Sequence, residues 1–419
     1  MNKLANILYF LWVFLMLQAD LKVTVNPYID WFFTFVLFVP VIMFNIKKLK
    51  ISFKKYYIIL LPSNLLIISM LLSSFNSSIQ IKNIFQSIKL ILLFFIIFPI
   101  LNLDDNYERI SFDAFILSSI VNFGLIIVGK LFIKSVAWEA AYLRYGTIFN
   151  MPGSLYKPGI FILPYILYIL LNKFSVNYLI LLITACGLIF FDGSRSGFIG
   201  LIIAILYIIM IYLSENVKFH SINIKKLNYY IILNTIFIIL LIVIINENLI
   251  PGLDRIDMFL NKIYNYGLIS GTIHSDPVRY QMIQKAINHI TSSPIIGDGF
   301  GVTNVNGIVI HNTYLQSWAD MGILGFISLI LLYFSWLLIL PKVINKIRYI
   351  KDFRYRGLIY NSIFSLFLYD LLGLFHPMSV EPSEWITFFV PYTIFINYYW
   401  KEIYDKSSKS INIYDSSSI

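Results

Sequence analysis

Long apolar runs recur along the whole chain of 419 residues, and they limit the possible folds more than any other feature. Most runs are about 16–25 residues long, and a helix of about 20 apolar residues crosses a hydrocarbon core about 30 Å thick. The runs are too long and too uniformly apolar for the alternating strands of a membrane β-barrel. We therefore expect an all-α polytopic membrane protein that forms a single membrane domain over residues 1–419.

About twelve transmembrane helices are predicted from these runs. Hydrophobic residues make up 58% of the chain and charged residues only 13%, whereas soluble domains carry about 25% charged residues. Because no small-residue cleavage site follows the first run, we expect it to be a retained span. The expected spans lie near residues 5–20, 30–46, 56–74, 85–103, 111–133, 158–172, 175–191, 197–213, 229–246, 313–340, 357–374 and 385–400.

The distribution of lysine and arginine predicts the orientation of these helices. Of the 32 Lys and Arg residues, 20 fall on one side of this topology, including the clusters Lys47–Lys55, Lys218–Lys226 and Lys342–Arg356 and the tail 401–419. The positive-inside rule makes that side cytoplasmic, together with both termini. The formal net charge of +10 follows from the topology and indicates no nucleic-acid partner.

One polar segment, residues 247–312, interrupts the apolar pattern and is predicted to be a large loop on the opposite, extracytoplasmic side. Connections of that length without structure are uncommon unless they are functional. Within the loop, Asp276-Pro277 predicts a helix start, because a carboxylate caps the first turn and proline suits its first position. The following residues have an apolar face at helical spacing, which we expect to rest on the membrane domain: Met282, Ile283, Ala286 and Ile290.

Three arginines on this outer side are candidates for binding a phosphorylated substrate. Arg279 shares the apolar face of the loop helix and should point inward, although snorkelling along the helix is an alternative. Arg195 lies in the short turn Ser194–Gly197, against the positive-inside bias, and a guanidinium matches phosphate oxygens in pairs. Simple anchoring at the membrane interface is its alternative. With Arg144 from the outer segment 134–157, these arginines resemble a clamp for a diphosphate.

His311 stands where the chain re-enters the membrane, and histidine is the side chain best suited to proton transfer near neutral pH. Asn312 is expected to cap the next helix, and Asn312, Gln316 and Asp320 form a polar stripe along it. A cap followed by ordinary interfacial polar residues is the alternative interpretation. Our catalytic candidates are His311, Arg195 and Arg279, and our substrate-binding candidates are Arg144, Asn312, Gln316, Ser194 and Tyr314.

Neither a metal site nor a cofactor site is predicted. The loop acids Asp254, Asp257, Asp276 and Asp298 show no pairing of the kind that divalent metal sites use. The glycine-rich segment Gly297–Gly301 follows no strand, so it predicts a tight turn rather than a dinucleotide site. Cys186, which has no second cysteine to pair with, lies within an apolar run.

The order of these features resembles the O-antigen ligase and O-antigen polymerase superfamily of bacterial envelope enzymes. The resemblance covers roughly residues 140–330. It is carried by the outer turn, the arginine-bearing loop helix and three short segments: Pro294–Gly301, His311–Gln316 and Gly322–Gly325. It implies a GT-C-like glycosyltransferase in the bacterial cytoplasmic membrane, with an extracytoplasmic active site and no nucleotide-sugar donor. For the ligases it also implies no metal.

The resemblance also implies a substrate and a role for each candidate. Arg195 and Arg279 would bind the diphosphate of an undecaprenyl-diphosphate-linked oligosaccharide, and His311 would assist the acceptor hydroxyl. Arg144 precedes a pattern similar to the family's, Gly146 followed by Phe149–Pro152. The implied partners are the lipid-linked donor, a glycan acceptor and membrane lipid, together with flippase and chain-length-regulator proteins.

Several functions stay open at this point. A compact loop and no extra domain favour a repeat-unit polymerase over a ligase that transfers glycan to a lipid core. A transporter or lipid-glycan flippase would place more charge deep in its spans, where this chain has few charged residues, such as Asp113 and Asp370. A membrane scaffold that binds a partner through the loop would leave the outer arginines unexplained.

Overall fold

A computed structural model describes residues 2–46, 53–102, 105–140, 144–216, 261–267, 270, 274, 276–303 and 309–404. Some predictions therefore lie outside the described residues. They are the span 229–246, the first part of the polar loop with Asp254 and Asp257, and the tail from residue 405 onward.

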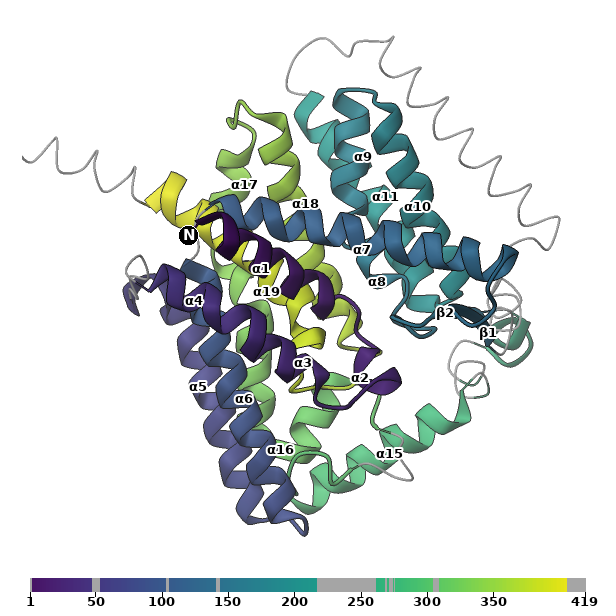
Figure 1. Ribbon diagram of the computed structural model, residues 1–419. Helices are drawn as coiled ribbons and strands as arrows, with labels where there is room; N and C mark the ends of the chain where they lie inside the picture. Colours follow the sequence, from purple (N-terminus) through teal and green to yellow (C-terminus); the bar gives the residue numbers. More distant parts are fainter. Residues whose placement is uncertain are drawn as a thin grey trace, which may run out of the picture.

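The described chain is mostly helical (Figure 1). Its first half contains α1 (Asn2–Met16), α2 (Leu21–Thr24), α3 (Ile29–Phe33), the π-helix η1 (Thr34–Phe38), α4 (Val39–Asn45), α5 (Phe53–Phe75), α6 (Gln80–Asn102), α7 (Asp105–Leu131), β1 (Ala137–Ala140), β2 (Arg144–Thr147), α8 (Lys157–Ile160), α9 (Leu163–Asn172), α10 (Val176–Asp192) and α11 (Arg195–Asn216). Its second half contains α15 (Pro277–Ser292), α16 (Thr313–Phe334), the 3₁₀-helix η3 (Ser335–Leu338), α17 (Leu340–Ile347), α18 (Phe353–Leu372), α19 (Pro382–Tyr398) and the π-helix η4 (Tyr399–Tyr404).

Four helical stretches of the described chain are long and apolar enough to cross a membrane: Tyr56–Phe75, Asn106–Leu131, Arg195–Glu215 and Thr313–Ile347. Shorter apolar helices occur at four of the other predicted spans: Lys3–Met16, Ile29–Asn45, Lys157–Asn172 and Val176–Asp192. The outer faces of the long helices carry exposed apolar side chains such as Ile68, Ile202 and Leu331, which suits contact with lipid. The protein is thus consistent with an all-α membrane protein, whereas the number of twelve spans is not confirmed.

A small β-hairpin is the one feature of the described fold that the all-α prediction lacked. Strands β1 and β2 pair antiparallel, with Trp138 opposite Gly146. The hairpin is tied to the helices through buried Thr147, whose hydroxyl donates to the Asn122 side chain at 2.8 Å. Each strand has only four residues, which is too short for an alternating pattern to be recognised in the sequence.

The helices form two outer groups and a third, central group that packs between them. Helices α5, α6 and α16 form the first group, and α9, α10 and α11 form the second (Figure 1). Between them, α1 packs on α7 and α19, and α18 packs on both α19 and α9. Helix α19 is buried along its length, with Trp385 and Phe388 in an aromatic cluster with Tyr333 and Tyr369. The core therefore lies around α18 and α19.

Segments that the predicted topology assigns to the outer side contact one another across long stretches of sequence. Lys22, after α1, pairs with Glu384 at the start of α19. Asn76, between α5 and α6, donates to the carbonyl of Gly297 at 2.9 Å. Tyr156, before α8, reaches His376 in the loop after α18. These contacts agree with one shared end for the loops, while the side of the membrane on which they lie stays a prediction.

Candidate functional site

The short turn predicted around Ser194–Gly197 is present between α10 and α11. Helix α10 ends at Asp192, Gly193 takes a left-handed conformation (φ +61°), and Arg195 begins α11. Gly197 lies against the ring of Tyr156, where an added Cβ would be 3.1 Å from the nearest ring carbon. An added side chain would have to push the Tyr156 ring back by a few tenths of an ångström, so glycine suits the close packing of the turn against Tyr156.

A chain of hydrogen bonds runs from this turn to His376. The hydroxyls of Ser194 and Ser196 are 2.7 Å apart, and Ser196 donates to the Tyr156 hydroxyl at 3.0 Å. That hydroxyl lies 3.4 Å from Nε2 of His376. Ser194, a predicted substrate-binding residue, is thereby part of a buried link between two loops.

Helix α15 is the loop helix predicted from the sequence, and Asp276 caps it by accepting from the backbone N–H of Arg279 at 3.2 Å. Its apolar face packs on α16 as expected, with Met282 and Ala286 buried against Ala319. The Arg279 side chain stands at the first turn and is 45% exposed, with Nε 3.1 Å from Oδ2 of Asp276. Its guanidinium is therefore held by one partly exposed carboxylate and is accessible from outside. The prediction that Arg279 points inward with the apolar face is wrong, because the first turn of α15, residues 277–281, is exposed and the packed face begins at Met282.

The glycine-rich segment after α15 is a tight turn, as predicted, and it docks on a break in α16. Gly322 has non-helical angles (φ +68°, ψ −172°) inside α16, and an added Cβ there would lie 2.1 Å from the Ile295 carbonyl oxygen. The backbone N–H of Gly299 donates to the Asp320 carbonyl at 2.8 Å. Backbone packs on backbone here, which only glycine allows.

His311 lies near the arginines at the entry to α16. It is half-buried, and its pKa is lowered by burial and by the positive charge of Arg279, while Asp276 acts in the opposite direction. The charge of Arg195 interacts with those of Asp276 and Arg279. Arg195, Arg279 and His311 thus all lie close enough to Asp276 for their charges to interact with its carboxylate, and we call these four residues the arginine–histidine cluster.

Three of the predicted substrate-binding residues at the start of α16 make hydrogen bonds within the protein. Asn312 caps the helix, as predicted, by accepting from the Leu315 N–H at 2.9 Å. The side chain of Gln316 accepts from the Met378 N–H at 2.8 Å and donates to Asp320 at 3.3 Å. The polar stripe therefore fixes neighbouring loops. Tyr314 donates to the Asp370 carbonyl oxygen at 2.7 Å.

Arg144 is engaged by the protein itself. Its Nε donates to the carbonyl oxygen of Asp192 at 2.7 Å, and its Nη2 pairs with the Asp192 carboxylate at 3.1 Å. The same carboxylate accepts from the N–H groups of Gly153 and Tyr156. Arg144 thus ties the hairpin to the turn before α11, and its role in substrate binding stays a prediction.

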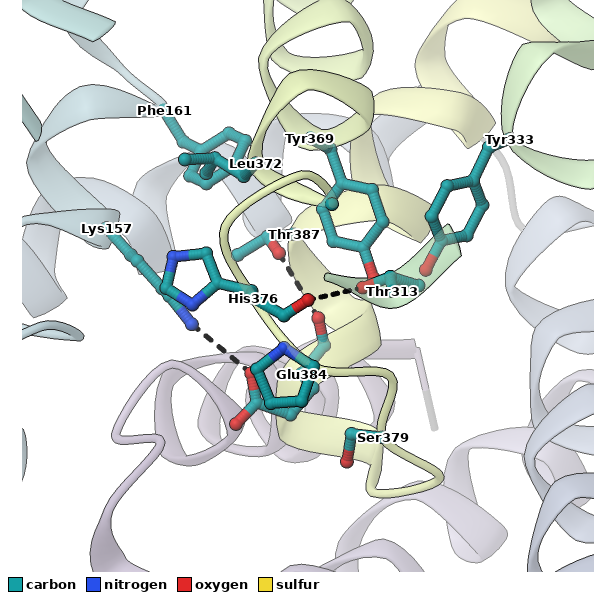
Figure 2. Close-up of a pocket in the computed structure, with 12 residues that line it drawn as sticks. Lys157, Phe161, Thr313, Tyr333, Tyr369, Leu372, His376, Ser379, Glu384 and Thr387 are labelled. Carbon is teal, nitrogen blue, oxygen red and sulfur yellow. Dashed lines mark hydrogen bonds and ion pairs between the residues drawn. The ribbon is translucent and has the colours of Figure 1, made fainter. Parts of the chain in front are cut away.

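A pocket beside the cluster contains polar residues that the sequence did not single out (Figure 2). Lys157 on α8 and Lys22 on α2 both pair with Glu384, at 3.2 and 3.0 Å. His376 lies next to Lys157, and burial together with that positive charge lowers the pKa of His376 to about 3. The only signal in the sequence is the grouping of His376 and Glu384 in one short outer segment. The pocket is lined by Lys157, Phe161, Thr313, Tyr333, Tyr369, Leu372, Gly373, His376, Pro377, Ser379, Glu384 and Thr387.

Comparison with known families bears on the residues of the cluster. Residues 180–330 match the O-antigen ligase family. This match confirms the resemblance to the O-antigen ligase and polymerase superfamily. The matched region contains Arg195, Arg279 and His311, whereas Arg144 and the pocket residue His376 lie outside it. No curated protein matched the sequence.

Metal ligands do not gather in the part of the chain that the structure describes. There, no group of three or more His, Cys, Asp or Glu side chains is arranged to hold a metal ion. The close pair His289 and Asp298, with Nδ1 and Oδ2 2.5 Å apart, instead joins the end of α15 to the glycine-rich turn. Asp298 therefore has a structural partner, in keeping with its predicted place in a turn.

Proposed function

We propose that the protein is a membrane glycosyltransferase that polymerises repeat units carried on undecaprenyl diphosphate, at the outer face of the cytoplasmic membrane. The observation that carries this proposal is that Arg195, Arg279 and His311, from three separate segments, lie within electrostatic reach of one carboxylate, that of Asp276. All three residues fall within the region that matches the O-antigen ligase family.

In this reaction the two arginines stabilise the leaving group. When the bond between the anomeric carbon and the phosphate oxygen breaks, negative charge develops on the departing undecaprenyl diphosphate. Two guanidinium groups already in place stabilise that charge most strongly in the transition state. Arg279 is half-exposed and paired with one carboxylate, so it is able to exchange that contact for a phosphate.

His311 is the base that accepts the proton of the acceptor hydroxyl. The acceptor hydroxyl oxygen bonds to the anomeric carbon, and its proton passes to the imidazole of His311 as the diphosphate leaves. A base must be unprotonated to do this, and burial and the charge of Arg279, which lower the pKa of His311, favour its neutral form. The attack on the face opposite the leaving group inverts the anomeric configuration.

A second candidate is a ligase that transfers the glycan to a lipid core, and the description of the matching family favours it. Deletion of the gene followed by gel analysis of the surface glycan separates the two functions. We expect the ladder of chain lengths to disappear while single capped repeats remain. Loss of all capped glycan would indicate the ligase instead.

The Arg195→Ala variant tests the site in the same assay. We expect it to insert into the membrane at the normal level and to give no ladder, since one of the two guanidinium groups is missing. A normal ladder from this variant would rule out the assignment.

A further inference from the structure

Tyr156 has no part in the chemistry proposed above, yet its buried side chain lies between the turn that carries Arg195 and the loop that contains His376. We propose that Tyr156 is a positioning residue, which fixes Arg195 where its guanidinium meets the donor diphosphate. This inference deepens the proposed function and rests on it, because the donor defines what Arg195 binds.

The chain before Arg195 is bound to the backbone of the segment that contains Tyr156. The buried Asp192 carboxylate accepts from the backbone N–H of Gly153 at 2.9 Å and from that of Tyr156 at 3.2 Å. Asp192 is the last residue of α10, three positions before Arg195. Backbone groups therefore fix this end of the turn, and a change of the Tyr156 side chain leaves them in place.

The chain after Arg195 is held by the Tyr156 side chain. The Ser196 hydroxyl donates to the Tyr156 hydroxyl at 3.0 Å, and Gly197 packs against the Tyr156 ring. The Ser194 hydroxyl lies 2.7 Å from that of Ser196 and extends the same network. Because Arg195 begins α11, the direction of the first turn of that helix decides where its guanidinium lies. The Tyr156 hydroxyl therefore helps to set that direction.

The Tyr156 hydroxyl also faces the loop next to His311. It lies 3.4 Å from Nε2 of His376. Thr313, two residues beyond His311, is bound to the same loop twice. Its N–H donates to the carbonyl oxygen of Gly373 at 2.7 Å, and its hydroxyl donates to that of His376 at 2.7 Å. Tyr156 thus links the turn before α11 to the segment that carries the proposed base.

A displaced Arg195 should affect the reaction more than the binding of the donor. Removing one buried hydrogen bond changes an equilibrium by about two- to tenfold. A displacement of about 1 Å at a group that acts in the transition state lowers a rate by up to about 10²-fold. We therefore expect the Tyr156 hydroxyl to influence the rate of transfer strongly and the affinity for the diphosphate to a smaller degree.

The first test measures the binding of undecaprenyl diphosphate, by titration of the full-length protein in nanodiscs. Tyr156→Phe keeps the ring that packs on Gly197 and removes only the hydroxyl, so it should raise the Kd by about two- to tenfold. In the Arg195→Ala background the same change should alter the Kd by less than about twofold, because the residue through which Tyr156 acts is missing. A role in the fold alone does not depend on Arg195. An equal factor in both backgrounds, or no effect in either, would therefore overturn the proposal.

Ser196→Ala keeps the proposal testable if Tyr156→Phe folds poorly. It removes the other partner of the same hydrogen bond, so it should raise the Kd by a similar factor. Adding Tyr156→Phe to Ser196→Ala should change the Kd by less than about twofold further, because both changes remove one shared interaction. A wild-type Kd in Ser196→Ala would contradict the proposal.

Tyr207→Phe is the matched control. Tyr207 lies on α11, as Arg195 does, and its hydroxyl donates to the Tyr360 carbonyl oxygen at 2.9 Å, about three turns further along the helix. This variant also loses one tyrosine hydroxyl, and it should bind undecaprenyl diphosphate with the wild-type Kd. A rise equal to that in Tyr156→Phe would show that any lost hydroxyl along α11 has the same effect, which would overturn a specific role for Tyr156.

Transfer of the host's lipid-linked repeat units is measured on the same samples. Tyr156→Phe should lower kcat by about 10- to 100-fold, and an unchanged kcat would contradict the proposal.

The two measurements separate failure of this inference from failure of the proposed function. If the effects of Tyr156→Phe and Arg195→Ala on the Kd are coupled but the wild type joins no repeat units, the proposed function fails and the positioning role stands. If the wild type transfers glycan and the two effects are independent, the positioning role fails and the proposed function stands. A wild type that does not bind undecaprenyl diphosphate overturns both.

Discussion

Arg144 and Arg279 were both predicted to contact the donor diphosphate, yet the structure places them in opposite environments. The Arg144 side chain is 18% exposed and its partner Asp192 is fully buried. The Arg279 side chain is 45% exposed, and its partner Asp276 is 31% exposed and belongs to the same helix end. One arginine is bound within the protein, and the other faces the surface with a single carboxylate beside it.

The difference indicates that the charge of Arg144 stabilises the fold, whereas the charge of Arg279 is available to a ligand. Removing one partner of a buried ion pair lowers the free energy of unfolding by several kcal/mol, because the other charge is left without a partner in a medium of low polarity. An exposed pair contributes about 0–1 kcal/mol and is easily exchanged for another anion. Three predictions test the contrast, from the largest expected effect to the smallest.

The Asp192→Ala variant should lower the free energy of unfolding by about 3–5 kcal/mol, because it leaves the Arg144 guanidinium and two backbone N–H groups without their carboxylate. Thermal unfolding of the purified protein in detergent measures the loss. The double variant Arg144→Leu with Asp192→Leu should recover part of it. If Asp192→Ala is as stable as the wild type, the ion pair does not stabilise the fold, and the result favours the prediction that Arg144 binds the substrate.

The Arg279→Ala variant should lose transfer activity by about 10²–10³-fold, the usual cost of removing one preorganised group that stabilises transition-state charge. Its unfolding free energy should change by less than about 1 kcal/mol, since the pair with Asp276 is half-exposed. In vitro transfer and thermal unfolding together check both parts. Lys285→Ala, on the same helix, removes an equal charge and should keep full activity. Equal losses in the two variants would mean that only the overall charge of α15 matters.

The Asp276→Asn variant should move the acid limb of the pH–rate profile to lower pH. His311 must be neutral to accept a proton, so the rate falls as the pH drops through its pKa, which burial and Arg279 already hold below the usual value. Asp276 raises that pKa, and its removal lowers it further, while asparagine still caps α15. Asp298→Asn, beside His289, should leave the limb in place. A shift to higher pH would show that another group is the base.

Local features of the site were largely predictable. Asp276 and Asn312 cap their helices as expected, because capping depends on residues only three positions apart. The apolar face of α15 packs on α16 for the same reason, since its spacing is set by the helix. The roles of Gln316 and Arg144 were not predictable, because each depends on a partner from a distant segment.

The sequence by itself determined that this protein is helical and suited to a membrane, and which family its central region resembles. These properties follow from composition, short-range periodicity and short segments of residues. Only the tertiary structure decided which arginine is bound internally, and that His376, Lys157 and Glu384 form a pocket beside His311. The physical reason is that burial and charge pairing depend on which helix ends come into contact. These contacts join residues far apart in the sequence, so no short-range pattern predicts them.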